Sequence, residues 1–330
     1  HYIGDKMKIA ILGAGAYGLA LGFAFKKNNN DIYVWSKFEE EINELKTKHK
    51  TNKLPGITIP EDFNYSTNME ECVKNAKIIV VAVPIIAVDN TVKELKKYIT
   101  KKQHICIASK GIEQNSCRFA HQIVAQYINF KNVSVISGPS FAIDVATDVP
   151  IGLAIAGKSR NTINVIKKGL ASNTIKLRIS KDMIGIEICG AIKNIIAIAS
   201  GMIEGMGLPE STQAFLITES IHDIKYLIHE IGGTKKTILT FAGVGDLFLT
   251  CTSDKSRNYT LGKMIGEKAD KKDIDKYIEN TTIEGLYTLK SMRSLLERES
   301  IKLPIINMIY SIIYKSKDCE ELKKFLITKD

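Results

Sequence analysis

The segment Asp182–Gly205, DMIGIEICGAIKNIIAIASGMIEG, constrains the fold of this chain more than any other stretch. At about 3.6 residues per turn it predicts about seven turns of helix, and nearly every face of that helix is apolar. Such a helix belongs in the core of a globular protein. Lys193 and Asn194 nevertheless interrupt it near its middle.

Lys193 has two interpretations. Burial disfavours the charged form of a lysine and lowers its pKa unless an acid partners it. A lysine can instead extend its stem along apolar surface and keep its ammonium in water. The helix alone leaves both interpretations open, so the decision depends on whether the rest of the chain supplies a carboxylate.

Length and charge narrow the function classes. A chain of 330 residues with 45% hydrophobic residues predicts about two domains with large cores. We find no run of about 18 uncharged apolar residues, so we expect no stable membrane insertion. The net charge of +10 suits anionic partners. The lysines are spread along the chain, however, and aromatic residues do not interleave with them, so we predict no nucleic-acid partner.

The cysteines and histidines predict neither disulfides nor a metal. The six cysteines are scattered without a CxxC pair, which favours reduced thiols and a cytoplasmic location. The six histidines lack the spacing of metal ligands. Residues 1–6, HYIGDK, precede Met7 and do not resemble a signal peptide, so we interpret them as a cloning remnant and leave them out of the fold prediction.

A glycine motif follows the first predicted strand. Lys8–Leu12 reads as a β-strand, Gly13–Gly18 (GAGAYG) follows at once, and Leu19–Lys27 has a helical pattern. This is G-x-G-x-x-G between a strand and a helix, where glycines permit a tight turn and close approach of N–H groups to a pyrophosphate. It predicts a dinucleotide site, and a glycine-rich turn without a ligand is the alternative.

The second predicted strand indicates which dinucleotide is bound. Asp31–Trp35 ends at Ser36 and Lys37. NAD-selective sites usually place an acid here, whereas a basic residue accommodates a 2′-phosphate. Lys37 and the Ser36 hydroxyl therefore favour NADP(H) over NAD(H), although a solvated surface lysine is the alternative.

The remaining strands of the first half predict a Rossmann-type, doubly wound parallel sheet in a domain covering residues 7–181. Three strands end at Pro84, at Ser109-Lys110-Gly111 and at Ser137-Gly138-Pro139-Ser140. The carboxyl ends of parallel strands open onto a ligand crevice, so Lys110 either reaches a phosphate or substrate oxygen there or is an exposed loop lysine. Segments 151–156, 162–171 and 174–179 are expected to complete this domain.

The second half, residues 182–330, predicts an all-α domain with polar groups in apolar surroundings. Ser211 is expected to cap the helix that follows Pro209. Asp246 lies within an apolar stretch, so it either caps a helix after Gly245 or meets Lys193. Ser256-Arg257-Asn258 opens a helix and combines N–H groups, a guanidinium and an amide into an anion site, with a capped helix and a surface arginine as the alternative.

Taken together, these residues resemble the bacterial NAD(P)-dependent glycerol-3-phosphate dehydrogenase family. The matching motifs run in family order from Met7 almost to the C-terminus. They are Gly13–Gly18 (GAGAYG), Ser109–Glu113 (SKGIE), Ser137–Ala142 (SGPSFA), Gly190–Ala197 (GAIKNIIA), Gly243–Thr252 (GVGDLFLTCT), Ser256–Asn258 (SRN) and Ile283–Gly285 (IEG).

The resemblance implies reversible reduction of dihydroxyacetone phosphate to sn-glycerol 3-phosphate, which supplies the backbone for phospholipid synthesis. It implies that Lys193 is the acid–base residue with Asp246 nearby. The implied substrate-binding residues are Lys110, Gly138, Ser140, Lys193, Asn194, Asp246, Ser256, Arg257 and Asn258. The implied cofactor-binding residues are Gly13, Gly15, Ala16, Tyr17, Gly18, Lys37, Lys110, Ala142, Arg257, Thr282 and Glu284.

The chain also departs from the family pattern. Ile85 and Ala16 stand where serine is common, and Gln213 and Glu219-Ser220 replace usually basic positions, which leaves the role of that helix open. A β-hydroxyacid dehydrogenase of the same fold type and a non-catalytic NADPH-sensing module are the competing functions. The apolar helical half favours a homodimer.

Overall fold

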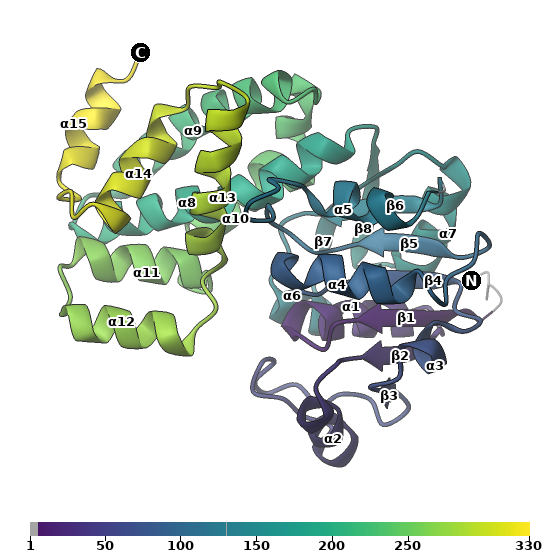
Figure 1. The fold of residues 1–330 in the computed structure, drawn as a ribbon. Coiled ribbons are helices and arrows are strands. Elements are labelled where there is room, and N and C mark those ends of the chain that lie inside the picture. Colours follow the sequence, from purple (N-terminus) through teal and green to yellow (C-terminus); the bar gives the residue numbers. More distant parts are fainter. Residues whose placement is uncertain (1–5, 130) are drawn as a thin grey trace. The chain divides into compact units, whose positions relative to one another are not determined.

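A computed structural model describes residues 6–129 and 131–330 (Figure 1). The chain divides into two compact units. The first unit contains residues up to Lys110 and Ala120–Met183, and the second contains Gly111–Phe119 and Ile184–Asp330. The interpretation of residues 1–6 as a cloning remnant falls, for residues 1–5, outside the described residues.

The first unit is built on a single eight-stranded sheet with the order β3-β2-β1-β4-β5-β6-β7-β8 in the described part of the chain. The strands are β1 (Lys8–Leu12), β2 (Asp31–Trp35), β3 (Asn64–Ser66), β4 (Ile78–Val81), β5 (His104–Ile107), β6 (Val133–Ser137), β7 (Ile151–Gly157) and β8 (Ile175–Ser180). Strands β1 to β6 are mutually parallel, so the predicted doubly wound α/β class is confirmed.

The last two strands run against the others, which the sequence interpretation did not specify. Strand β7 pairs antiparallel with β6, and β8 pairs parallel with β7. Between β6 and β7 lies only the five-residue helix α6 (Ala142–Ala146). That helix is about 7.5 Å long, whereas β6 is about 16 Å long, so α6 is too short to return the chain along the sheet for a parallel crossover.

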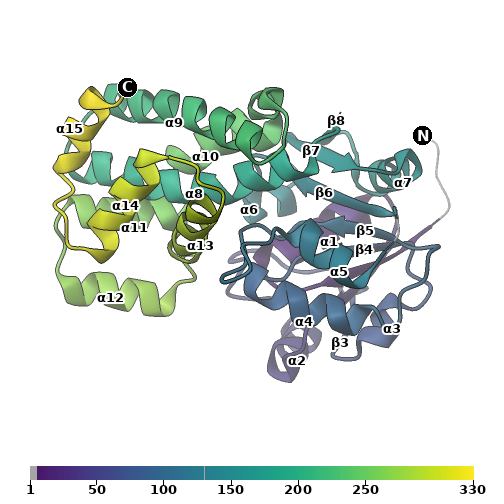
Figure 2. The same ribbon diagram turned by 45° about the horizontal axis from the view of Figure 1, so that its top comes forward.

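Helices cover both faces of this sheet, which explains why β4 and β5 are buried along their whole length. On one face α4 (Ile85–Leu95) and α5 (Ala120–Tyr127) lie side by side (Figure 2). On the other face α1 (Ala16–Lys27) packs against α6 and α7 (Arg160–Leu170). The other two helices described in this unit are α2 (Glu39–Lys48) and α3 (Met69–Val73).

The segment Gly111–Phe119 departs from the predicted domain division. The sequence interpretation placed it in the first domain, within residues 7–181, but it belongs to the second unit. The reason is apolar burial, because Ile112, Cys117 and Phe119 lie in the hydrophobic core of the second unit. The Gln114 N–H also donates to the Tyr287 hydroxyl of that unit at 3.1 Å.

The second unit is built from helices, as predicted. They are α8 (Met183–Gly205), α9 (Glu210–Glu230), the 3₁₀ turn η1 (Lys235–Leu239), the π turn η2 (Phe241–Gly245), α10 (Asp246–Cys251), α11 (Arg257–Gly266), α12 (Lys271–Asn280), α13 (Glu284–Arg298), α14 (Pro304–Tyr314) and α15 (Glu321–Thr328). One detail was wrong: α9 begins at Glu210 with Pro209 at the N-cap position, so Ser211 is not its cap.

Helix α8 lies in the core of the second unit. In the described residues it alone is long and apolar enough to cross a membrane, but 89% of its most apolar window is buried inside the protein, which is typical of a core helix. All six cysteines of the chain are buried, and none of them is in a disulfide bond.

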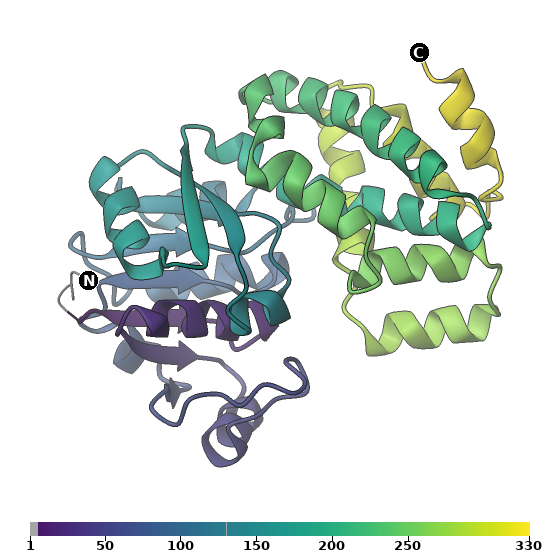
Figure 3. The ribbon, with the colours of Figure 1, turned by 180° about the vertical axis from the view of Figure 1, so that it is seen from behind.

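Four glycines bring α8 and α11 into backbone contact, and Figures 1 and 3 show the two helices alongside each other. They are spaced four apart on each helix, at Gly201 and Gly205 on α8 and at Gly262 and Gly266 on α11. A Cβ at any of the four would overlap a backbone carbonyl of the facing helix. Only glycine permits such an approach, so these four positions set the distance between the helices.

We predict that Gly262→Ala destabilises the protein. In an open helix this change gains up to about 1 kcal/mol, because alanine is the better helix former. Here the new methyl would meet the Ile198 carbonyl of α8, and overpacking of this kind costs about 1–3 kcal/mol. Urea denaturation of the wild type and the variant measures the difference. A higher denaturation midpoint in the variant would contradict this prediction, because it would show that α8 and α11 can move apart to accommodate the methyl group at no cost in stability.

Candidate active site

An ion pair between Lys193 and Asp246 lies inside the second unit. The Lys193 ammonium is 2.7 Å from the Asp246 carboxylate, and the two residues are 9% and 1% exposed. The predicted contact between α8 and the start of α10 is therefore present. Replacing a buried ion pair by apolar residues often leaves stability equal or higher, so such a pair is weak evidence for a stabilising role and better evidence for a chemical one.

The backbone before α10 aims Asp246 at Lys193. The π turn η2 contains one residue with non-helical angles, Gly243, whose φ is −86° and ψ −109°. A Cβ on Gly243 would overlap the Ile238 carbonyl, so the bend requires glycine there. Helix α10 then begins at Asp246 itself, with Gly245 in the N-cap position, so the alternative of Asp246 as a capping residue is not realised.

Thr250 and Cys251 of α10 are neighbours of the pair. The Thr250 hydroxyl lies 2.7 Å from the Asp246 carbonyl and 3.3 Å from its carboxylate. Burial raises the pKa of the Cys251 thiol; nearby Lys193 lowers this pKa and Asp246 raises it. The thiol therefore stays neutral at physiological pH. The Ser200 hydroxyl donates to the Cys251 carbonyl at 2.6 Å and ties the end of α10 to α8.

Two asparagines connect the starts of neighbouring helices. The Asn194 amide donates to the Glu284 carboxylate at 3.2 Å, which links α8 to the first residue of α13. The Asn258 side-chain carbonyl accepts from the Gly285 N–H at 2.8 Å, which links α11 to the same helix start. Both asparagines were predicted to bind substrate, and the structure gives each a positioning contact as well.

The predicted cap of α11 is confirmed. The Ser256 hydroxyl accepts from the Tyr259 N–H at 3.3 Å, and the helix begins at Arg257. Arg257 is exposed, and its carbonyl accepts from the Tyr277 hydroxyl at 3.3 Å. The start of α11 is thus capped, and its arginine is exposed. This arrangement is compatible with both interpretations of the segment, an anion site and a capped helix with a surface arginine.

In the first unit the glycine turn has the geometry that a dinucleotide pyrophosphate needs. Gly13 has a φ of +118°, and its N–H donates to the Trp35 carbonyl at 2.9 Å. A Cβ on Gly18 would overlap the Gly13 carbonyl. Helix α1 begins at Ala16 with Gly15 at its N-cap position, and the N–H groups at the start of a helix suit an anion that approaches this turn.

Three further predicted residues meet beside this turn. The Tyr17 and Ser140 hydroxyls are hydrogen-bonded at 3.0 Å, and the Lys110 ammonium lies 5.5 Å from the centre of the Tyr17 ring. Ser140 also donates to the Gly138 carbonyl at 3.0 Å. Ala142, which was predicted to face the cofactor, is the first residue of α6.

Other predicted residues have different environments. Lys37 is exposed, with its ammonium 4.9 Å from the centre of the Phe38 ring. The Ser36 hydroxyl, which was part of the argument for NADP(H), donates to the Glu41 carboxylate instead of standing open. Thr282 and Glu284 are exposed just before and at the start of α13.

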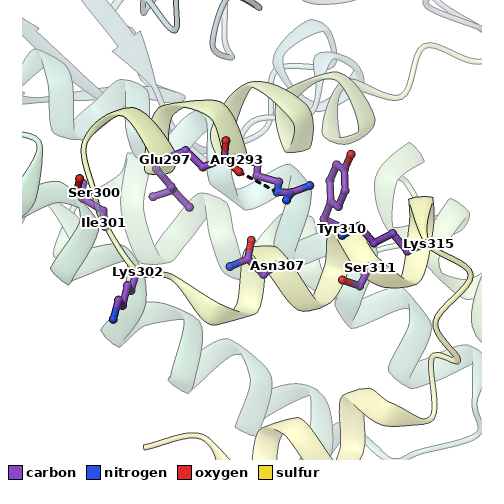
Figure 4. A pocket seen from close by; sticks show the side chains of 10 residues that line it. Arg293, Glu297, Ser300, Ile301, Lys302, Asn307, Tyr310, Ser311 and Lys315 are labelled. Atoms are coloured by element: carbon purple, nitrogen blue, oxygen red, sulfur yellow. Dashed lines mark ion pairs between the residues drawn. The ribbon is translucent and has the colours of Figure 1, made fainter.

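A surface cavity of about 440 Å³ lies beside α13 and α14 (Figure 4). In it the Arg293 guanidinium lies 4.2 Å from the centre of the Tyr310 ring and 3.4 Å from the Glu297 carboxylate. None of the residues described as lining this cavity is among the predicted site residues. We therefore do not assign the candidate active site to it.

Comparisons with known proteins identify the family. Residues 8–163 match the profile of the NAD-dependent glycerol-3-phosphate dehydrogenase N-terminus, and residues 182–324 match that of its C-terminus. The chain belongs to the NAD-dependent glycerol-3-phosphate dehydrogenase family. These enzymes are oxidoreductases, so the predicted enzyme class and the use of a nicotinamide cofactor follow from membership.

Individual relatives match over nearly the whole chain. A glycerol-3-phosphate dehydrogenase (NAD(P)+) of Agathobacter rectalis is 32% identical over 98% of this chain and 96% of its own length. One of Fusobacterium nucleatum is 33% identical over 98% and 97%. The crystal structure of glycerol-3-phosphate dehydrogenase from Coxiella burnetii is 31% identical, with a TM-score of 0.92 and coverage of 98% of this chain and 99% of that one.

Gln213 has a role that the sequence left open. Its buried amide donates to the Tyr259 hydroxyl at 2.7 Å and to the Ser200 carbonyl at 3.2 Å. One side chain of α9 thereby fixes the first turn of α11 against α8. Glu219, another of the departures on α9, binds the Lys329 ammonium at 2.9 Å, so it anchors the C-terminus.

We predict that Gln213→Leu lowers the free energy of unfolding by about 1–3 kcal/mol, because it removes the two buried hydrogen bonds that the Gln213 amide donates to the Tyr259 hydroxyl and the Ser200 carbonyl. The double variant Gln213→Leu with Tyr259→Phe is expected to lose less stability than the sum of the two single variants, since both substitutions remove the same hydrogen bond between Gln213 and Tyr259. Chemical denaturation of the single and double variants completes the cycle. Strict additivity of the two losses would contradict the proposed coupling.

Proposed function

We propose that this chain catalyses the reversible, NAD(P)H-dependent reduction of dihydroxyacetone phosphate to sn-glycerol 3-phosphate and so supplies the backbone for phospholipid synthesis. The observation that carries the proposal is the buried Lys193–Asp246 pair in a member of this dehydrogenase family. A paired ammonium in a desolvated position suits a reaction in which negative charge develops on an oxygen.

Lys193 is the proposed acid–base residue. A bound nicotinamide would supply the hydride for the ketone carbon of the substrate. Lys193 stabilises the negative charge that develops on the carbonyl oxygen and donates the proton to that oxygen. Asp246 keeps the amine charged and fixes its direction, and the Thr250 hydroxyl, 3.3 Å from the same carboxylate oxygen, helps to hold Asp246 in place.

The substrate phosphate is proposed to bind at the start of α11. Ser256 caps the helix, the guanidinium of Arg257 offers paired donors, and Asn258 lies next to them. Binding energy from the phosphate orients the reacting carbon, although the phosphate itself does not react. The additional substrate contacts that we propose are Lys110, Gly138, Ser140 and Asn194.

The first unit is proposed to bind the cofactor. The turn Gly13–Gly18 would hold the pyrophosphate, because its shape depends on glycine at both ends. We favour NADP(H) over NAD(H) because Lys37 follows β2; the Ser36 hydroxyl, which donates to Glu41, adds no support. The further proposed cofactor contacts are Tyr17, Lys110, Ala142, Arg257, Thr282 and Glu284. We also propose a cytoplasmic homodimer.

A cofactor oxidation assay tests the proposed activity. On addition of dihydroxyacetone phosphate the protein is expected to oxidise NADPH and NADH, with the higher kcat/KM for NADPH. Replacing the substrate by 3-oxo acids, or running the reverse reaction with 3-hydroxy acids, should give no turnover. Turnover of the acids alone would indicate a β-hydroxyacid dehydrogenase, and no cofactor oxidation at all would indicate a sensing module.

We predict that Lys193→Met lowers kcat by about 10²–10⁴-fold, the usual contribution of a positioned acid, while NADPH still binds. Removing one partner of a buried pair is destabilising, so the double variant Lys193→Met with Asp246→Asn serves as a second, better-folded test. Lys263→Met, which removes a half-buried lysine of α11, is the control and should retain turnover. Near-normal kcat in both Lys193 variants would refute the assignment.

A further inference from the structure

The end of strand β2 lies directly beside the glycine turn of the first unit. The Gly13 N–H donates to the carbonyl of Trp35, the last residue of β2, at 2.9 Å. In dinucleotide-binding sheets the residue that follows this strand faces the adenosine ribose, where the 2′ position distinguishes NAD from NADP. In this chain that residue is Ser36, which is only 4% exposed.

A carboxylate is held at this strand end. Glu41 in the first turn of α2 accepts a hydrogen bond from the Ser36 hydroxyl through one oxygen and pairs with the Lys53 ammonium through the other. The Ser36 oxygen in turn accepts from the Phe38 N–H at 3.2 Å. The serine hydroxyl thus donates and accepts within the protein, and the Glu41 side chain, 19% exposed, is fixed from two sides.

The charges around Ser36 have opposite effects on a 2′-phosphate. Lys37 is exposed and attracts it, whereas Glu41 repels it. Lys53 offsets part of the repulsion, because it pairs with the same carboxylate. A ribose 2′-hydroxyl would meet no such repulsion and could donate to a carboxylate, the usual arrangement in NAD-selective sites. The balance between the cofactors therefore depends on Glu41, five positions after Ser36.

We propose that Glu41 is a specificity-determining residue for the adenosine ribose, that its carboxylate disfavours a 2′-phosphate at the end of β2, and that Lys53 moderates this effect by fixing and partly neutralising the carboxylate. The proposal rests on the proposed function in one respect, that the first unit binds a nicotinamide dinucleotide. It does not depend on the identity of the substrate.

Direct titration of the full-length protein with NADPH and with NADH, followed by nicotinamide fluorescence, tests the proposal through the ratio of the two Kd values. Glu41→Gln keeps an oxygen that can accept from Ser36 and removes the charge. It is expected to shift the ratio towards NADPH by about tenfold, allowing for the screening of a partly exposed charge. Lys53→Met leaves the carboxylate unopposed and is expected to shift the ratio towards NADH by about threefold.

A second pair on the same helix provides matched controls. Glu44 and Lys48 of α2 form an exposed ion pair at 3.5 Å, so Glu44→Gln and Lys48→Met make the same charge changes away from Ser36. Each should change the ratio by less than about twofold, because exposed charges are strongly screened.

Two results would overturn the proposal. In the first, the ratio of the NADPH and NADH Kd values stays as in the wild type in both Glu41→Gln and Lys53→Met. In the second, the Glu44 and Lys48 controls change the Kd ratio as much as the Glu41 and Lys53 variants do. The net charge of the protein, and not the position of Glu41, would then explain the effect. If the protein binds both cofactors but does not reduce dihydroxyacetone phosphate, the proposed activity fails while the Kd ratios still decide the role of Glu41.

Discussion

The buried contact between Lys193 and Asp246 is the interaction on which the candidate active site depends. An ammonium in a helix as apolar as α8 is tolerable only with a carboxylate at hydrogen-bonding distance, and the carboxylate comes from residues far along the chain. The bend at Gly243 directs Asp246 towards it, and the Thr250 hydroxyl lies 3.3 Å from the same carboxylate oxygen. The need for glycine at the bend at position 243 thus determines where the Asp246 carboxylate lies.

The second constraint is the close approach of α8 and α11. Gly201 and Gly262 bring the backbones together, so the start of α11 is fixed against the helix that carries Lys193. Gln213 secures the same turn through Tyr259. The amine and the proposed phosphate site are therefore parts of one rigid packing arrangement, in which their separation does not depend on flexible side chains.

Much of this could be predicted from the sequence, and the reasons differ between features. The glycine turn and the Ser256 cap are local, so their residue types are sufficient to reveal them. The partnership of Lys193 with Asp246 follows from the cost of a lone buried charge. The direction of β7, the position of Gly111–Phe119 and the contacts of Gln213 depend on packing between distant segments, which residue types do not encode. The four packing glycines recur at a spacing of four on each helix, but a spacing alone does not show which helix lies opposite.

The burial of all six cysteines has a practical consequence. Burial raises the pKa of the Cys72 and Cys106 thiols to about 12, and also raises that of Cys251. Because the thiolate is the reactive form, the folded protein should resist alkylating and oxidising reagents. Cys106 lies in the sheet of the first unit and Cys251 among the helices of the second. The rates at which they are alkylated would therefore report separately on the opening of each unit.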